Sequence, residues 1–171
     1  MTLVMKKLYI MCGLAFSGKS TLAKKIAEEK RALLVSQDQF WFEREEEMNL
    51  DLDSDDDWEK ILRLSRAEVR RLLAEENSVV YDDISLKYSD RELLRNLANE
   101  YGAEAILVYL DTPREIQLER RRKNLETKKR HDIPDHILEW GDGQLEIPQE
   151  TERPVVFRPD SDVASWLKEL P

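Results

Sequence analysis

The sequence has few of the residues that tie a chain together covalently or through metals. Its single cysteine, Cys12, excludes an intramolecular disulfide, so a reducing compartment such as the cytoplasm is the expected location. The apolar neighbours of Cys12 favour a core position over a nucleophilic one. The two histidines, His131 and His136, lack the soft ligands that a zinc site needs. We therefore expect neither disulfides nor zinc to hold the fold together.

Long hydrophobic runs are also missing. The apolar runs are short and interrupted by charge, and the first leads into a glycine-containing loop rather than to a small-residue cleavage site. We therefore expect no membrane span and no membrane partner. The formal net charge of −9 argues against a broad attraction to nucleic acid, which relies on a basic surface, although a local basic site is compatible with it.

The chain is predicted to form one globular domain over residues 1–171, and its apolar runs alternate with amphipathic stretches. The runs predict strands at residues 7–12, 32–36, 78–82, 103–111 and 154–157. The amphipathic stretches predict helices at residues 18–30, 56–76, 89–101, 113–124, 134–144 and 161–170. This alternation is typical of right-handed crossovers between parallel strands, so the predicted fold class is α/β with helices on both faces of a parallel sheet.

The segment GLAFSGKS, residues 13–20, matches GxxxxGK[ST] and lies between a predicted strand and a predicted helix. In such a Walker A loop, backbone N–H groups point at phosphate oxygens, Lys19 reaches the β- and γ-phosphates, and Ser20 can bind Mg²⁺. The alternative is a glycine-containing turn with a solvated lysine. The loop predicts binding of ATP with Mg²⁺, through Gly13, Ala15, Phe16, Ser17, Gly18, Lys19, Ser20 and Thr21.

Carboxylates follow two other predicted strands, at the edge where doubly wound sheets collect their ligands. Asp38 comes just after the second strand, where it could accept a proton from an attacking hydroxyl group. A helix N-cap or turn aspartate is the alternative for Asp38. Asp82 and Asp83 end the third strand and fit a Walker B position, which binds Mg²⁺ directly or through water. One of them would suffice, and the other could cap the next segment.

A basic cluster follows the fourth predicted strand. Arg120, Arg121, Arg122 and Lys123 stand late in a predicted helix, and residues 128–130 continue the basic run. We predict a lid at about residues 120–136 that closes over bound triphosphate, with one or two arginines neutralising the transferring phosphoryl group. The alternative is a solvated helix end, whose cations suit the helix dipole.

Five segments together resemble a known family: GLAFSGKST, the SQD after strand two, VVYDDISLKYSDRELLRNLA, VYLDTP and LERRRKN. They are similar to the small AAA-type P-loop kinases, which include the polynucleotide 5′-kinase domain, gluconate kinase, chloramphenicol phosphotransferase and zeta-toxin-like kinases. The resemblance implies a P-loop NTPase fold with a five-stranded parallel sheet, and a small helical acceptor cap at about residues 40–75. It also implies that Lys19 and Asp38 are catalytic, with Asp38 as base, that Asp83 or Asp82 is the Walker B acid, and that Arg120, Arg121 and Arg122 are the nucleotide and lid arginines.

One departure from polynucleotide kinases bears on the acceptor. Those kinases tend to place a phosphate-gripping arginine three residues after the catalytic aspartate, whereas this chain has Trp41 there, followed by the acidic residues 43–59. If this stretch lines the acceptor site, it would repel nucleic acid and favour a neutral or cationic small molecule. Its aromatic residues, which would supply apolar or stacking faces, are Phe40, Trp41, Phe42 and Trp58. The alternative is a solvated loop and helix N-terminus.

The sequence therefore predicts an ATP-dependent kinase that transfers the γ-phosphoryl group of ATP to a hydroxyl of an unidentified small-molecule acceptor. Phosphorylation of a polynucleotide or nucleoside 5′-hydroxyl is the closest alternative, and the acidic stretch disfavours it. An alternative of another class is a nucleotide-dependent switch or regulatory ATP-binding module. The acceptor and the oligomeric state are left open.

Overall fold

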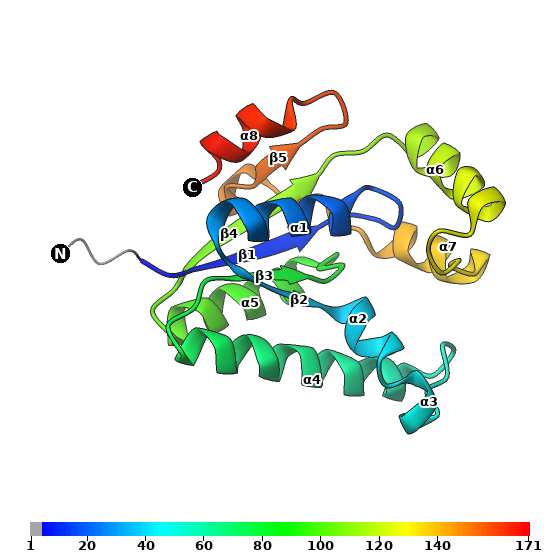
Figure 1. Cartoon of the computed structure of the whole chain (residues 1–171), viewed down its shortest axis with the longest axis horizontal. Coiled ribbons are helices and arrows are strands. Elements are labelled where there is room, and N and C mark those ends of the chain that lie inside the picture. Colours follow the sequence, from blue (N-terminus) through cyan, green and yellow to red (C-terminus); the bar gives the residue numbers. More distant parts are fainter. Residues whose placement is uncertain (1–4) are drawn as a thin grey trace.

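The computed structural model describes residues 5–171, and it has the predicted α/β architecture (Figure 1). Parallel strands form one five-stranded sheet in the order β2-β3-β1-β4-β5. The strands are β1 (Lys7–Cys12), β2 (Leu33–Ser36), β3 (Val79–Asp82), β4 (Glu104–Leu110) and β5 (Val155–Phe157). Each lies within a predicted strand, so the prediction of a five-stranded parallel sheet is confirmed. The predicted domain also includes residues 1–4, which lie outside the described residues.

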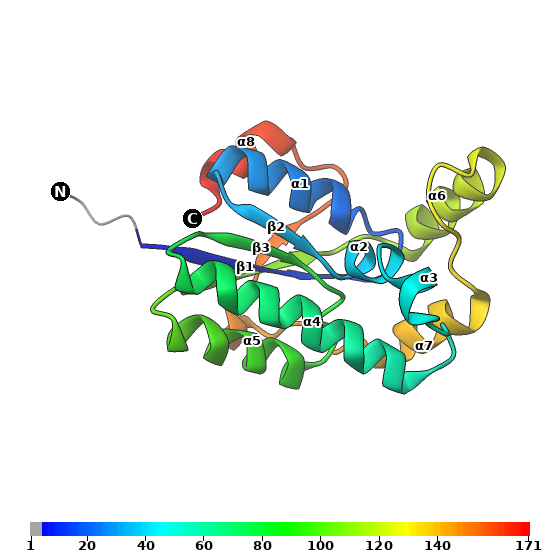
Figure 2. The same ribbon diagram turned by 60° about the horizontal axis from the view of Figure 1, so that its bottom comes forward.

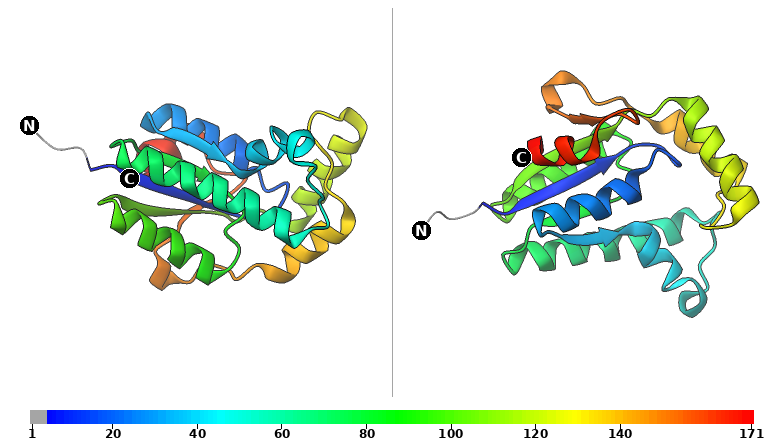
Figure 3. Two further views of the ribbon diagram at one scale, coloured as in Figure 1. Left: turned by 90° about the horizontal axis from the view of Figure 1, so that it is seen from below. Right: turned by 45° about the horizontal axis from the view of Figure 1, so that its top comes forward.

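Helices cover both faces of this sheet, as Figures 2 and 3 show. On one face pack α1 (Lys19–Lys30) and α8 (Val163–Glu169). On the other face lie α4 (Asp55–Ala74) and α5 (Tyr88–Glu100). The result is a three-layer arrangement of helices, sheet and helices. A strand that is a continuous apolar run requires this arrangement, because the side chains on both faces of the strand must be buried.

The central strand β1 shows this two-sided burial directly. Leu8, Ile10 and Cys12 contribute to the core under α4 and α5, whereas Tyr9 and Met11 contribute to the core under α1 and α8. Burial is also the main cause that raises the pKa of the Cys12 thiol to about 11. The prediction that Cys12 is a core residue is therefore confirmed, and its thiol is a poor nucleophile at neutral pH.

Further helices gather beyond the carboxyl ends of the strands (Figure 3). They are α2 (Gln37–Phe42), α3 (Glu45–Met48), α6 (Arg114–Thr127) and α7 (Asp135–Gln144). The 3₁₀ turn η1 (Glu150–Glu152) comes just before β5 in the chain. Neither α2, α3 nor η1 was predicted, because helices of this length are too short to show a 3.6-residue apolar period. Within residues 5–171, no helix combines the length and apolarity needed to cross the bilayer.

A buried ion pair ties α5 to the segment that follows α7. Arg91 is fully buried and donates from Nε and Nη2 to the two carboxylate oxygens of Glu152, at 2.7 and 2.9 Å. Its Nη1 donates to the carbonyl oxygens of Ser85 and Leu86, at 3.1 and 2.7 Å. Arg95 donates to Glu152 as well, at 2.8 Å. The loop that follows β3 is thus held in place from α5.

This pair predicts a specific loss of stability in acid. Burial raises the pKa of Glu152, but hydrogen bonds from Arg91, Arg95 and the Gln149 N–H outweigh it and lower the pKa to about 2. The ionised form therefore stabilises the fold above the ordinary pKa of 4.5, and this contribution is lost as pH falls from there toward 2. Glu152→Gln should lower the unfolding free energy at pH 7 by about 3 kcal/mol and flatten its decline below pH 4.5.

Urea denaturation of both proteins across this pH range measures the difference. The matched control is Glu150→Gln, in the same 3₁₀ turn, where the side chain is exposed and carries no ion pair within residues 5–171. Equal effects of the two substitutions at pH 7 would contradict a stabilising role for the buried pair.

Candidate active site

The loop between β1 and α1 favours glycine at two positions. At Gly13, a Cβ atom would lie 3.0 Å from Ser17 Oγ and 3.2 Å from Leu110 Cβ. At Gly18, which caps α1, φ is +99° and a Cβ would lie 3.1 Å from Arg120 Nη1. The backbone conformation at Gly18 therefore favours glycine, and a side chain at Gly13 would be crowded by its neighbours.

The same loop is held from outside by the connection between β4 and α6. The carbonyl oxygen of Ser17 accepts hydrogen bonds from Thr112 Oγ1 at 2.9 Å and from Arg120 Nη1 at 2.7 Å. Arg120 Nη1 also donates to the carbonyl of Phe16 at 3.1 Å, and Gln117 Nε2 donates to that of Thr112 at 2.7 Å. Because these bonds occupy loop carbonyls, the loop and the start of α1 are left to offer N–H groups, which bind anions.

Charged groups from several elements meet at Asp82, the last residue of β3. Burial raises the pKa of this carboxyl. The Lys19 ammonium group and a hydrogen bond from the Ser20 side chain oppose the shift. Charge repulsion from Asp38 adds to it, and the positive charge of Arg130 opposes it. The structure thus brings together both Walker A side chains, the predicted base and one of the two Walker B candidates.

The neighbouring carboxylate, Asp83, has different surroundings. It is almost fully buried and accepts the Ile84 N–H at 2.6 Å. Burial raises its pKa to about 6, against the opposing charges of Arg66 and Lys19 and the Ile84 hydrogen bond. Asp83 therefore fastens the turn after β3, whereas Asp82 lies against the side chains of the phosphate loop.

Asp38 is the second residue of α2, in the first turn of the helix. The N-cap of this helix is Ser36, whose Oγ accepts the Gln39 N–H at 3.4 Å, so capping is not the task of Asp38. Ser36 also pairs with Asp82 in the sheet register, which explains why Asp38 and Asp82 lie at the same edge. The Asp38 side chain is exposed and forms no hydrogen bond with any described residue.

The three arginines that were predicted to bind the nucleotide and to belong to the lid have three different environments. Arg120 contacts the phosphate loop, as described above. Arg121 pairs with Asp135 at 2.6 Å and donates to the Ile133 carbonyl at 3.1 Å, so it fastens the predicted lid to the start of α7. Arg122 is exposed, and within residues 5–171 it forms no side-chain hydrogen bond or ion pair. Only Arg120 of the three touches the loop.

Arg130, for which the sequence suggested no individual role, also reaches the loop. Its guanidinium carbon lies 4.6 Å above the centroid of the Phe16 ring. The buried amide of Asn124 holds its backbone on both sides, donating to the Arg130 carbonyl and accepting its N–H, each at 3.1 Å. No sequence pattern marks this clamp, because it joins a helix to the irregular segment that follows.

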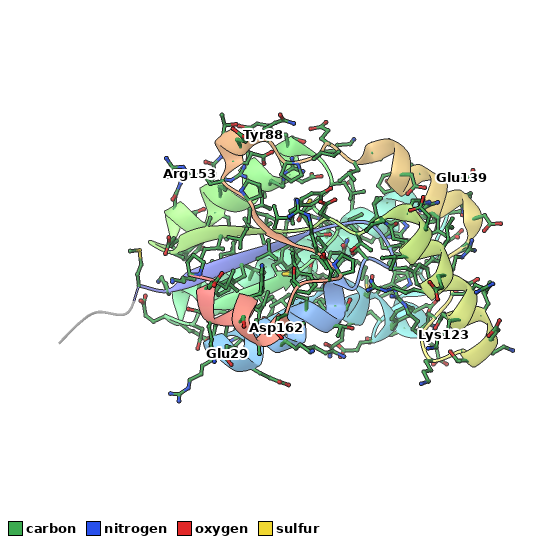
Figure 4. All side chains as sticks on the ribbon, turned by 90° about the horizontal axis from the view of Figure 1, so that it is seen from above. Glu29, Tyr88, Lys123, Glu139, Arg153 and Asp162 are labelled. Carbon is green, nitrogen blue, oxygen red and sulfur yellow. The ribbon has the colours of Figure 1, made fainter. Side chains whose placement is uncertain are left out.

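A pocket of about 510 Å³ adjoins the loop. It is lined by residues of α1, α6, the segment after α6 and the β5–α8 region, among them Thr21, Lys25, Lys123, Lys129, Phe157, Pro159 and Val163. Figure 4 labels Lys123 on α6 and Asp162 at the start of α8. The residues after β5 were not predicted as site residues, although the carboxyl end of a parallel strand is the signal that could have indicated them. A larger hollow, of about 600 Å³ beside β5, contains no predicted site residue.

The aromatic residues of the predicted cap differ from expectation at Trp41. Its side chain is buried and stacks on Trp58, with ring centroids 4.1 Å apart. The expectation that Trp41 offers a face to an acceptor is therefore wrong, because the ring packs inside the segment that carries it. Phe42, by contrast, is exposed and stacks on His131, with centroids 3.9 Å apart.

Several carboxylates of the acidic stretch have local structural partners. Asp57 Oδ2 accepts the Asp51 N–H and Asp51 Oδ1 accepts the Asp53 N–H, both at 3.0 Å. Ser54 caps α4, whose first turn carries Asp55, Asp56 and Asp57. Acidic residues in that position are favourable for the helix dipole, so part of the run is explained by the start of α4.

Comparisons with known proteins agree with this geometry. A family model described as an AAA domain matches residues 8–148, which include nearly all of β1, the phosphate loop, both aspartate positions and α6. The chain belongs to this AAA domain family. No match was found among curated proteins.

Several solved structures share the fold of this protein over nearly the whole length of both chains. Kti12 from Chaetomium thermophilum, in complex with ADP-AlF3, is 19% identical, with a TM-score of 0.74 and coverage of 95% of this chain and 94% of that one. A gluconokinase from Sinorhizobium meliloti 1021 is 24% identical, with a TM-score of 0.67 and coverage of 97% and 90%. The Mycobacterium tuberculosis APS kinase CysC, in complex with AMPPNP and APS, is 24% identical, with a TM-score of 0.63 and coverage of 96% and 95%. The predicted P-loop NTPase fold is confirmed.

The geometry of Gly18 predicts a position-specific effect of alanine on stability. Gly18→Ala should lower the unfolding free energy by about 1–2 kcal/mol, because alanine is strained at positive φ and its Cβ would crowd Arg120. Gly143→Ala is the matched control, since nothing lies within 4 Å of a Cβ there and the residue is helical. It should stabilise the protein slightly. Thermal unfolding of both variants measures this, and a neutral Gly18→Ala would contradict the described loop.

Proposed function

We propose that this protein is an ATP-dependent kinase that transfers the γ-phosphoryl group of ATP to a hydroxyl of a small molecule. The observation that carries the proposal is that Asp82 and Asp38 follow neighbouring strands at the edge of the sheet where the β1–α1 loop lies, and that Lys19, Ser20, Asp38 and Arg130 all influence the pKa of Asp82. Phosphoryl transfer needs these parts together: cations and a metal ligand at the phosphates, and a base directed at the acceptor. A nucleotide switch would not require the exposed carboxylate of Asp38 beside them.

In this proposal the phosphates of ATP lie on the loop of residues 13–20, against N–H groups at the start of α1. Lys19 reaches the β- and γ-phosphates, while Arg120 keeps the loop carbonyls turned outward through its bonds to Phe16 and Ser17. The nucleoside occupies the pocket of about 510 Å³ between α1, α6 and the β5–α8 connection. Cations such as Lys25 and Lys123 line that pocket and suit a polyphosphate ligand.

The residues present fit Mg²⁺. Ser20 and Asp82 supply a hydroxyl and a carboxylate, and the Ser20 side chain is among the groups that lower the pKa of Asp82. Oxygen ligands of this kind are those that Mg²⁺ prefers. Asp83 stands next in the chain but is engaged by the Ile84 N–H, so Asp82 is the better candidate. When bound, the ion would neutralise charge on the β- and γ-phosphates.

Asp38 is proposed as the general base. Its carboxylate takes the proton of the acceptor hydroxyl while the hydroxyl oxygen forms a bond to the γ-phosphorus, and the bond from that phosphorus to the oxygen of ADP breaks. Arg130, held over Phe16 by the Asn124 clamp, is placed to offset negative charge in this step.

The small-molecule acceptor is supported by two observations. Exposed acidic residues, Glu45, Glu46 and Glu47 among them, lie on α3, close to the helix that carries Asp38. Two of the structurally similar proteins, the gluconokinase and the APS kinase, are named for small-molecule substrates. The test is a screen of small hydroxylated compounds and 5′-hydroxyl oligonucleotides for stimulated ADP release. Slow hydrolysis that no acceptor stimulates, but that alters binding to a protein partner, would favour the switch.

Lys19→Ala should abolish ATP binding or turnover while the protein stays folded. The lysine acts on phosphates and is not part of the hydrophobic core. Titration with a fluorescent ATP analogue and a thermal unfolding curve measure both properties. An unchanged ATP affinity with unchanged turnover would rule out the Walker A assignment.

Asp38→Asn should leave ATP affinity nearly intact and slow phosphoryl transfer by roughly 10²- to 10⁴-fold, since the amide keeps the shape but accepts no proton. Steady-state kinetics with an acceptor from the screen measure this. Transfer within a few-fold of the wild-type rate would mean that Asp38 is only a residue of the α2 turn.

Oligonucleotides with a 5′-hydroxyl should be poor acceptors even at low salt, where attraction between charges is strongest. The acidic side of the cleft offers a phosphodiester chain no release of counterions. Transfer from γ-labelled ATP to DNA and RNA oligonucleotides measures this. Efficient labelling of an oligonucleotide that is lost in Asp38→Asn would contradict this prediction and make polynucleotide kinase the leading function.

A further inference from the structure

Phe16 has a backbone conformation that is unusual for a phenylalanine. Its φ is +60°, in the left-handed region that L-residues with bulky side chains avoid. Four other non-glycine residues with positive φ, Arg31, Asn49, Lys128 and Arg153, stand at the C-terminal caps of helical segments, where this conformation is common. Phe16 ends no helix and lies in the loop before α1. Its strained backbone therefore needs another explanation.

The backbone contact of Phe16 does not require a side chain at this position. Its carbonyl oxygen accepts a hydrogen bond from Arg120 Nη1 at 3.1 Å, and a glycine in the same conformation would accept the same bond. Glycine would also adopt the positive φ without strain. What glycine lacks is the phenyl ring, so the ring is the part of Phe16 that has to be explained.

The ring of Phe16 is buried without belonging to the hydrophobic core. Only 6% of the residue is exposed, yet it is part of neither core cluster found among residues 5–171. It lines the pocket beside the phosphate loop, together with polar residues of α6 and of the segment after α6. Its burial therefore comes from the candidate site and not from the packing of helices on the sheet.

The guanidinium group of Arg130 lies on this ring. Its carbon is 4.6 Å from the ring centroid, which is within the range of a cation–π interaction. Asn124 holds only the backbone of Arg130, and within residues 5–171 the Arg130 side chain forms no hydrogen bond or ion pair. A long exposed side chain without a partner would populate several rotamers. The Phe16 ring is thus the group that holds the guanidinium in one place.

We infer that Phe16 is a positioning residue, whose ring aims the Arg130 guanidinium at the transferring phosphoryl group. The inference rests on the proposed function, because Arg130 is assigned there to offset negative charge in the transfer step. Arg130 lines the same pocket as Ser17 and Gly18 of the phosphate loop, so its charge is on the side of the phosphates. The strained conformation of Phe16 is explained if a ring is needed at this point of the loop.

This role predicts a particular kinetic effect. A cation that is already in place stabilises the charge of the transition state without reorganising during the reaction. Loss of the ring should therefore lower kcat more than it changes KM for ATP. A ring that served only packing would instead change stability and nucleotide affinity.

The first experiment measures ADP formation from ATP with Mg²⁺ in the full chain, with water as the probe in place of the unidentified acceptor. The water oxygen bonds to the γ-phosphorus, the bond to the ADP oxygen breaks, and a proton passes to Asp38, which gives ADP and inorganic phosphate. Phe16→Leu keeps an apolar side chain without an aromatic face. It should lower kcat by roughly three- to thirtyfold and leave KM for ATP within about twofold. Phe16→Tyr, which keeps the face, should remain near the wild-type rate.

A double-mutant cycle separates positioning from a general structural effect. Arg130→Ala should lower kcat by at least as much as Phe16→Leu does. Adding Phe16→Leu to Arg130→Ala should lower kcat no further, because the ring then has no guanidinium to hold. Arg31→Ala, at an exposed arginine just past the far end of α1, is the charge-matched control and should leave kcat unchanged.

Binding of a fluorescent ADP analogue with Mg²⁺, with and without aluminium fluoride, gives a readout besides turnover. The planar fluoride complex stands in for the transferring phosphoryl group, so the gain in affinity that it causes reports stabilisation of the transition state. This gain should shrink by roughly three- to thirtyfold in Phe16→Leu, with the affinity for the ADP analogue alone within about twofold. If Phe16→Leu does not fold, Phe16→Gly, which removes the strain together with the ring, takes its place.

The inference would be overturned by an unchanged kcat and fluoride-dependent gain in Phe16→Leu, or by an equal loss in Phe16→Tyr. An unchanged kcat in Arg130→Ala, or a further fall in the double variant, would overturn it as well. If the wild type shows neither ATP binding nor hydrolysis that depends on Lys19, the proposed function itself fails. Hydrolysis that depends on Lys19 and Arg130 but not on Phe16 would contradict the positioning role alone.

Discussion

The carbonyl oxygen of Ser17 is the point on which the candidate active site depends. It accepts hydrogen bonds from Thr112, just after β4, and from Arg120 on α6. The phosphate loop is therefore not shaped by its glycines alone, since two elements about a hundred residues away in the sequence hold its backbone. Because Arg120 lies on the helix that leads into the predicted lid, the position of the lid and the shape of the loop are mechanically joined.

The parts of the molecule that depend on the sheet could be predicted from the sequence. The central strands β1, β3 and β4 are largely buried on both faces and are apolar runs. The edge strands β2 and β5 are only partly buried but are also apolar runs, so all five strands were found. Parallel strands bring their carboxyl ends to one edge, which is why Asp38 and Asp82, 44 positions apart, could be expected to meet the Walker A loop. The parallel topology brings these distant residues to the same edge, so it was enough to identify in the sequence which residues follow each strand.

The parts that depend on irregular segments could not be predicted. Charge composition marked the basic run of residues 120–130 but not the task of each member, because a contact with the loop, a tie to α7 and a solvated position look alike in sequence. The Asn124 clamp on Arg130 depends on the path of the chain after α6. Trp41 was expected to face a ligand because it follows Asp38 closely, yet its ring is buried against Trp58, which lies on α4.

The acidic residues of the predicted cap bear on the acceptor to different degrees. Several carboxylates of residues 51–57 are hydrogen-bonded at the start of α4, so the repulsion of a polyanion rests mainly on exposed acids such as those of α3. Repulsion between exposed charges fades over about 8 Å at physiological ionic strength. Discrimination against a charged polymer should therefore weaken as salt rises.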